Sequence, residues 1–86
     1  MNGRKIVWLW LVTGGRDWRG VADSFGQAQH DAETCIENGG KSAVVESAVW
    51  GFNGAAMQWE YTRTGRRCTA RRVGGQIEWT DFGWSR

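Results

Sequence analysis

The stretch MQWEYTRTGRRCTARRVGGQIEWTDF, residues 57–82, alternates apolar and polar side chains around two glycine-containing turn signals. An alternation with a period of two is typical of strands that are half buried in a sheet. Thr64-Gly65 and Gly74-Gly75 are short turn signals, which predict that the chain reverses direction at each of them. The strands predicted from this stretch are residues 57–63, 66–73 and 76–82.

Two-residue turns at both positions also predict how these strands pair. They place Trp59 opposite Ala70 and Tyr61 opposite Cys68, and they place Ala70 opposite Trp79. Residues that lie opposite one another share a face of the sheet, so the pairing separates the side chains into two sets. The predicted apolar face carries Met57, Trp59, Tyr61, Cys68, Ala70, Ile77 and Trp79. The predicted polar face carries Gln58, Glu60, Thr62, Arg67, Thr69, Arg71, Glu78 and Thr80.

One helix is predicted upstream of these strands. Ser24 followed three residues later by Gln27 is a capping-box pattern, and Gly39-Gly40 is a helix stop. Between them, apolar residues recur at steps of three and four and form one stripe, which we expect to cover the apolar face of the sheet. The residues of this stripe are Phe25, Ala28, Ala32, Cys35 and Ile36.

Further strands are predicted on both sides of the helix. The uninterrupted apolar run from Ile6 to Val12 predicts a strand over residues 4–13, and Gly14-Gly15 turns it into a second strand over residues 17–22. After the helix, residues 43–50 predict a strand that ends in a turn over residues 51–54, with Asn53-Gly54 as its strongest element.

The length of the chain allows one domain, because 86 residues can bury a single modest core. We therefore predict a single small α+β domain over residues 1–86. Its fold class is one helix packed on an antiparallel, largely meander β-sheet in the order β-β-α-β-β-β-β.

Bulk properties argue against a membrane or secreted protein. The longest apolar run has seven residues, whereas a membrane-spanning helix needs about 20. Both cysteines fall at positions predicted to face the core, which suits reduced thiols and a cytoplasmic protein. A single Cys35–Cys68 disulfide is the alternative.

The sequence contains no catalytic or cofactor motif. His30 is the only histidine, it falls on the polar side of the predicted helix, and no Gly-x-Ser-x-Gly nucleophile elbow occurs. A zinc site built from His30, Cys35, Cys68 and a carboxylate would have none of the standard ligand spacings. We therefore predict a non-enzymatic protein with no catalytic residues, no metal and no cofactor.

The tryptophan and arginine residues are the features of the sequence that indicate a binding surface. Seven Trp are more than a core of this size can hide. If Val7, Leu9 and Leu11 face the core, the other side of the same strand leaves Trp8 and Trp10 exposed or covered. The cover would be the chain's own tail (Phe82, Trp84), a second subunit or a partner. The alternative is a sheet that curls and buries both faces.

Five Arg lie within ten residues, and the predicted hairpin over residues 63–72 places Arg63, Arg66 and Arg67 at its tip. Guanidinium groups suit phosphates, so nucleic acid is one candidate partner. The predicted polar face has no aromatic platform, however, and a net charge of +2 is small for a nucleic-acid-binding domain.

We therefore predict a protein-binding module that acts by occluding a partner protein. The expected contact residues are Trp8, Trp10, Arg63, Arg66, Arg67 and Arg71. The alternative is a nucleic-acid-binding module that uses the Arg-rich hairpin 63–72. A homodimer that forms through the first strand is compatible with both.

The overall character of the chain agrees with the first of these predictions. A short, Pro-free chain that is rich in Trp and Gly and has no catalytic signature resembles the small accessory proteins of phages and mobile elements. These include anti-CRISPR and other anti-defence inhibitors, so the resemblance implies an inhibitor.

Overall fold

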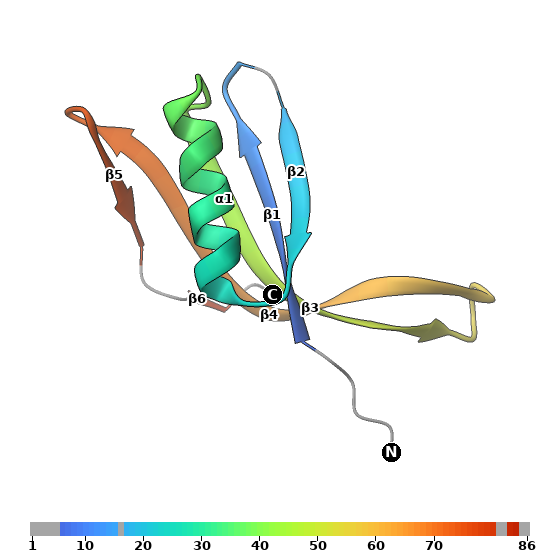
Figure 1. The fold of residues 1–86 in the computed structure, drawn as a ribbon. Helices are drawn as coiled ribbons and strands as arrows, with labels where there is room; N and C mark the ends of the chain where they lie inside the picture. The colour runs from blue at the N-terminus through green and yellow to red at the C-terminus, as the bar shows by residue number, and fades with distance from the viewer. Residues whose placement is uncertain (1–5, 16, 81–82, 85–86) are drawn as a thin grey trace.

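A computed structural model describes residues 6–15, 17–80 and 83–84 (Figure 1). Strands β1 (Ile6–Thr13) and β2 (Trp18–Ala22) precede helix α1 (Phe25–Glu37). Four strands follow the helix: β3 (Ser42–Asn53), β4 (Gln58–Val73), β5 (Gln76–Trp79) and β6 (Gly83–Trp84).

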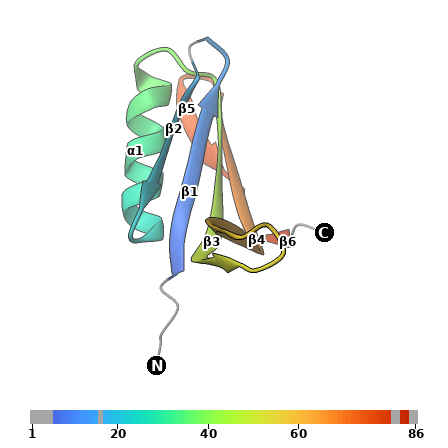
Figure 2. The ribbon, with the colours of Figure 1, turned by 90° about the vertical axis from the view of Figure 1, so that its right-hand side faces the viewer.

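All strand pairs are antiparallel, and the sheet has the order β2-β1-β3-β4-β5, with β6 pairing to β4. The helix covers one face of this sheet (Figure 2). The predicted fold class, one helix on an antiparallel sheet, is confirmed. Because β1 lies between β2 and β3, its residues from Trp8 to Val12 are paired on both edges.

The predicted helix signals are confirmed in detail. The Ser24 hydroxyl accepts a hydrogen bond of 3.1 Å from the backbone N–H of Gln27, which caps the first turn. Ala28, Ala32 and Ile36 are fully buried against the sheet. In the described part of the chain, no helix has the length and apolar character needed to cross a membrane.

The helix-facing side of β1 is the one with the tryptophans. Trp10 pairs with Val45 and Val12 pairs with Ala43, and these residues pack beneath α1 together with Trp8. Val7, Leu9 and Leu11, which one of the sequence-based alternatives placed toward the core, therefore lie on the face of β1 away from the helix. The helix presents small side chains to the sheet, so large indoles from the sheet fill the space between the two layers.

The turn predicted at Thr64-Gly65 does not exist. β4 is one continuous strand of 16 residues that follows the reversal of the chain just after Asn53. The sequence predicts that reversal over residues 51–54, but residues 51–53 belong to β3 and the turn covers residues 54–57. The Asn53 side-chain oxygen accepts hydrogen bonds from the backbone N–H groups of Ala55 (3.0 Å) and Ala56 (3.3 Å), which stabilises this tight turn. Gly65 does have a positive φ of 99°, but it uses that conformation inside a β-bulge.

Because the turn at Thr64-Gly65 is absent, residues 58–63 pair with β3 and not with residues 66–73. Trp59 lies opposite Phe52 and Tyr61 lies opposite Trp50, not opposite Ala70 and Cys68. The second turn is confirmed, since Ala70 does pair with Trp79. On the predicted apolar face, Cys68, Ala70, Ile77 and Trp79 are buried or half-buried, whereas Met57, Trp59 and Tyr61 are exposed. The strand predicted over residues 76–82 ends at Trp79, and residues 81–82 lie outside the described residues.

One hydrogen bond joins the helix to the far end of the sheet. The indole Nε1 of Trp79 donates to the Glu33 carboxylate at 2.6 Å, in a partly buried position. Replacing Trp79 by Phe keeps a ring but removes this donor. We expect Trp79→Phe to lower the free energy of unfolding by about 2 kcal/mol, the usual size for a hydrogen bond to a charged group. Urea unfolding measures the change, and Glu33→Gln, which keeps an acceptor, should cost less. An unchanged urea midpoint for Trp79→Phe would contradict this role for the bond.

Candidate functional site

The β3–β4 hairpin continues beyond the body of the domain. We call its outer part, residues 49–62, the arm (Figure 1). The domain is elongated, with extents of 45 × 24 × 22 Å. In Figure 2 the helix and the arm lie on opposite sides of β1 and β2.

A bulge lies at the base of the arm. The register of β3 and β4 shifts between Glu46 and Ala48, so that residues 64–66 of β4 stand opposite Ser47 alone. The Ser47 hydroxyl is buried and hydrogen-bonded to the Thr64 hydroxyl. Extra residues on one strand bend a hairpin and increase its twist, which accounts for the change of direction seen in Figure 1.

One face of the arm is a row of aromatic rings. Strand alternation and cross-strand pairing bring four aromatic side chains together there. Their exposed fractions lie between 41% and 59%, and Met57 at the tip is 76% exposed. We call the four rings the aromatic strip: Trp50, Phe52, Trp59 and Tyr61.

The rings of the strip support one another. Trp50 and Trp59 are stacked, with centroids 6.1 Å apart, and Trp50 meets Tyr61 at 4.7 Å. Phe52 meets Trp59 edge to face at 5.8 Å. Such contacts hold the exposed rings in a defined arrangement.

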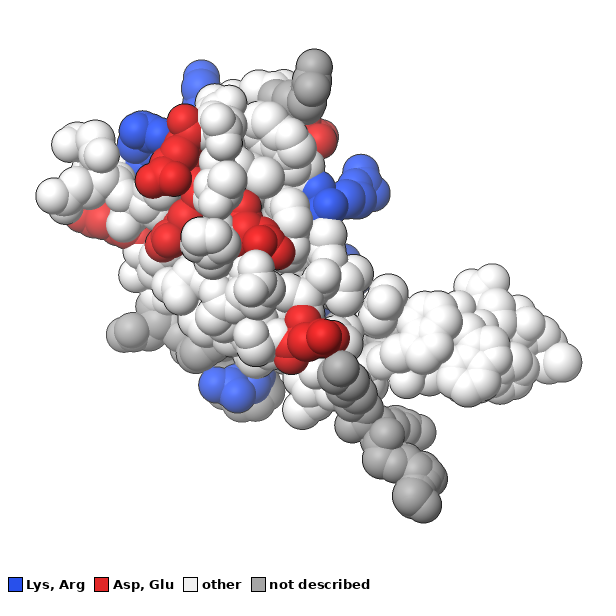
Figure 3. Space-filling view, in the orientation of Figure 1, with Lys and Arg blue, Asp and Glu red and all other residues white. Residues whose placement is uncertain are grey.

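The arm carries almost no charge. Glu60 is the only charged residue between positions 49 and 62, and it accepts a hydrogen bond of 2.6 Å from the Asn53 side-chain amide. Figure 3 shows the arm free of acidic and basic side chains on the face in view, whereas acidic side chains gather over the helix.

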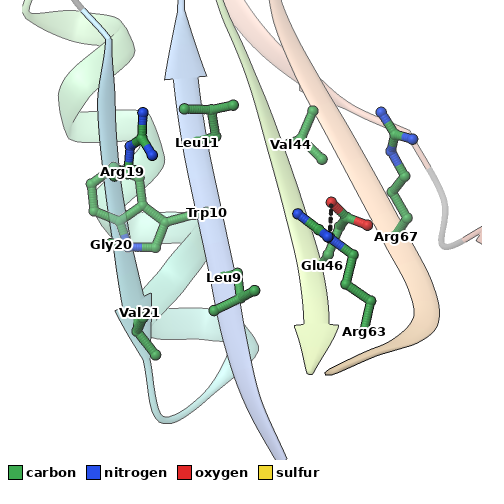
Figure 4. A pocket seen from close by; sticks show the side chains of 10 residues that line it. All are labelled: Leu9, Trp10, Leu11, Arg19, Gly20, Val21, Val44, Glu46, Arg63 and Arg67. Atoms are coloured by element: carbon green, nitrogen blue, oxygen red, sulfur yellow. Dashed lines mark hydrogen bonds and ion pairs between the residues drawn. The ribbon is translucent and has the colours of Figure 1, made fainter. Parts of the chain in front are cut away.

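The sheet face away from the helix contains a shallow hollow of about 440 Å³ (Figure 4). We use "the hollow" for this feature. Its floor is apolar and its remaining walls are mostly charged. The apolar side chains are Leu9, Leu11, Val21 and Val44, and the charged ones are Arg19, Glu46, Arg63 and Arg67, with Trp10 and Gly20 completing the lining. Leu11 and Val21 are 37% and 47% exposed.

The charges around the hollow are only partly compensated. The Nε atom of Arg63 lies 3.2 Å from a Glu46 carboxylate oxygen, in an ion pair that is open to solvent on the arginine side. Among the described residues, Arg19 and Arg67 have no acidic partner. The lining therefore holds three positive charges against one negative charge.

The structure does not gather the predicted contact residues into one patch. Trp8 packs edge to face on Phe25 at 5.2 Å, and Trp10 covers Gly20 from the helix side. Both are only partly exposed and lie on the helix side of the sheet, which answers the question of their exposure that the sequence left open.

The predicted arginines are also separated. The guanidinium of Arg66 lies 5.8 Å from the centre of the Trp8 ring. Arg67 and Arg71 pair with Glu46 and Ser42 across the sheet, so they lie along the strand and not at a hairpin tip. Arg72 donates a hydrogen bond of 3.1 Å to the Ile36 carbonyl at the end of α1.

Sequence reasoning missed the aromatic strip. The sequence predicts a turn over residues 51–54, but the hairpin closes through residues 54–57 with Asn53 paired to Gln58, and this longer loop is what places Trp50 opposite Tyr61 and Phe52 opposite Trp59.

The cysteines are both free thiols. Burial, with a smaller contribution from the negative charge of Asp31, raises the pKa of the Cys35 thiol above its ordinary value. A raised pKa leaves less of the reactive thiolate at neutral pH. Within the described residues, no three His, Cys, Asp or Glu side chains come together in a group that could hold a metal ion.

Comparisons with protein families, with curated proteins and with solved structures found no match for this chain. The fold and the site define it as a small α+β domain that carries an aromatic hairpin arm beside an arginine-lined hollow.

Proposed function

We propose that this chain is a non-enzymatic protein-binding module whose contact surface is the aromatic strip. The observation that carries the proposal is the exposure of four clustered aromatic rings on an arm that projects from the domain. Contiguous exposed apolar patches usually mark interaction sites, and Trp and Tyr are enriched at binding hot spots.

Without a partner, the rings of the strip are only partly shielded from water. The rings contact one another, yet about half of their surface stays in water, so they contribute less to the core than buried rings would. Covering them with a partner removes this surface from water and requires little ordering, because the rings are already in contact. An inhibitor of the kind expected from the sequence would use such an arm to cover the working surface of its target.

The distribution of charge favours protein over nucleic acid. Binding to single strands combines aromatic platforms with a positive groove, and the arm contains no Lys or Arg. Of the clustered arginines, Arg63 is paired with Glu46, Arg66 lies over Trp8 and Arg72 binds the end of the helix. Nucleic-acid binding is therefore the competing outcome of the test below.

The test compares capture of partners by the wild-type chain with capture by the double variant Trp50→Ser/Trp59→Ser. The matched control is Val73→Ser, an exposed apolar residue at the opposite end of β4. Tagged full-length chains are incubated with host lysate, and each bound protein is then titrated in purified form. We expect the double variant to weaken binding at least about 100-fold, since two hot-spot rings are lost. The control should bind like the wild type, and all three chains should melt at similar temperatures.

Two results would overturn the proposal. Equal retention of the partner by the double variant would show that the strip is not the contact surface. Capture that disappears on nuclease treatment, with affinity that falls linearly on a log–log plot against salt, would assign the site to nucleic acid.

A further inference from the structure

We infer that the partner of the aromatic strip is a second copy of this chain, and that two copies exchange arms so that each strip packs on the hollow of the other. The inference rests on the proposed function, because it uses the same strip and names its occupant. It joins the strip and the hollow in one interface.

The two surfaces are chemically complementary. The strip consists of aromatic rings, and the hollow has an apolar floor with Arg19 and Arg67 beside it. A guanidinium is attracted to the face of an indole or phenol ring. The domain already contains one such pair, Arg66 over Trp8 at 5.8 Å.

The charges of the arm and the hollow also favour packing of the strip on the hollow. The arm carries one negative charge, from Glu60, and the residues that line the hollow carry a net charge of +2. Strip packed against strip would bring two negative arms together. Strip packed against hollow brings opposite charges together and gives the two arginines aromatic partners.

The topology prevents a strip from covering its own hollow. β3 is continuous from Ser42 to Asn53, with Val44 in the hollow and Trp50 in the strip on the same face of the strand. Six residues of extended strand separate them by about 20 Å. The strip can therefore reach a hollow only on another molecule.

A two-fold axis uses both contacts at once. Because strip and hollow lie on one face of the same strand, two copies placed face to face bring each arm over the hollow of the other, as a closed isologous dimer requires. A stable interface buries about 800 Å² on each partner. Four half-exposed aromatic rings supply on the order of 400 Å². One arm alone therefore falls short, and reciprocal exchange adds the hollow to the buried surface of each copy.

Analytical ultracentrifugation of the full chain tests the inference. The arm variant is Trp50→Ser/Trp59→Ser, the hollow variant is Val21→Glu, and Val73→Ser is again the matched control. We expect the wild type and the control to sediment as dimers in the micromolar range. Each of the other two variants should be monomeric, with dimerisation weakened at least about 100-fold.

Mixing the arm and hollow variants is the decisive step. The mixture should associate more tightly than either variant alone and more weakly than the wild type, because the intact arm of one chain meets the intact hollow of the other and restores one of the two contacts. Strip-against-strip packing predicts no such gain, so a mixture that associates no more tightly than the separate variants would overturn the exchange. A wild-type chain that is monomeric would also overturn it. If that monomer still loses a captured partner through Trp50→Ser/Trp59→Ser, the proposed function stands without the dimer. A dimer that survives the arm variant would overturn the exchange, and the capture experiment with the same variant would then decide the proposed function by itself.

Discussion

Ile36→Ala is expected to lower the free energy of unfolding by about 3 kcal/mol, the usual range for removing a large buried side chain. Ile36 is fully buried, and it is the largest fully buried side chain among the described residues. The other buried members of its cluster are Val12, Ala32, Ala43 and Ala70, and the partly buried Trp10, Trp18, Cys35, Ile77 and Trp79 pack against them. Alanine neighbours cannot extend into the space that the mutation leaves, so the cavity persists.

The consequence is large for a domain of this size. A chain of 86 residues has a total stability of roughly 4–13 kcal/mol. A loss of about 3 kcal/mol should lower the melting temperature by about 15 °C. Thermal and urea unfolding measure both quantities. The control is Glu37→Ala, the exposed next residue, which should change stability by less than about 0.5 kcal/mol. A loss below about 1 kcal/mol for Ile36→Ala would show that this cluster is not the centre of the core.

Gly20→Ala is expected to destabilise the domain by about 2 kcal/mol through overpacking. A Cβ atom at position 20 would lie 2.6 Å from Cζ2 of the Trp10 ring, and two further atoms of the same ring lie within 2.8 Å. The indole cannot swing aside freely, because it packs among the buried side chains beneath the helix. Urea unfolding gives the change in stability.

The matched control is the same substitution at a position with open space. Around Gly26, in the first turn of α1, no atom lies within 4 Å of an added Cβ. Alanine is a better helix former than glycine, so Gly26→Ala should stabilise the domain by about 0.5 kcal/mol. The two substitutions should thus have opposite signs. If Gly20→Ala also stabilised the domain, Trp10 would not lie over β2 as described.

Together, the two proposals imply that self-association controls access of other proteins to the aromatic strip. In an exchanged dimer the strip is covered, so a different protein that binds the strip must compete with the second copy. Self-association would then keep the aromatic rings out of water until that partner is present. The aromatic rings would then be exposed to water only when the dimer dissociates.

Local patterns were sufficient to predict much of the fold. The helix signals around Ser24 and Gly39 depend on residues three or four positions apart, and the Gly74-Gly75 hairpin depends on its two neighbouring strands. Their structure is decided within a few residues of chain, so the sequence alone could assign them.

The candidate site could not be assigned in this way. Gly65 signals a positive φ, but a turn and a bulge both use that conformation, and only the length of the partner strand β3 decides between them. Predicting an additional turn at Thr64-Gly65 gave Trp59 and Tyr61 the wrong partners. It also assigned two exposed rings to the core.

The sequence by itself determined the fold class, the position of the helix and the hairpin at Gly74-Gly75, because these follow from local periodicity, capping and turn chemistry. Only the tertiary structure decided which face of β1 meets the helix and that β4 continues through Thr64-Gly65 and pairs with β3 along the arm. β1 is apolar on both faces, so its pattern has no preferred side until the small residues of α1 leave room for the indoles of Trp8 and Trp10. The aromatic arm depends in turn on pairing between distant strands, and that pairing places its rings in solvent and not in the core.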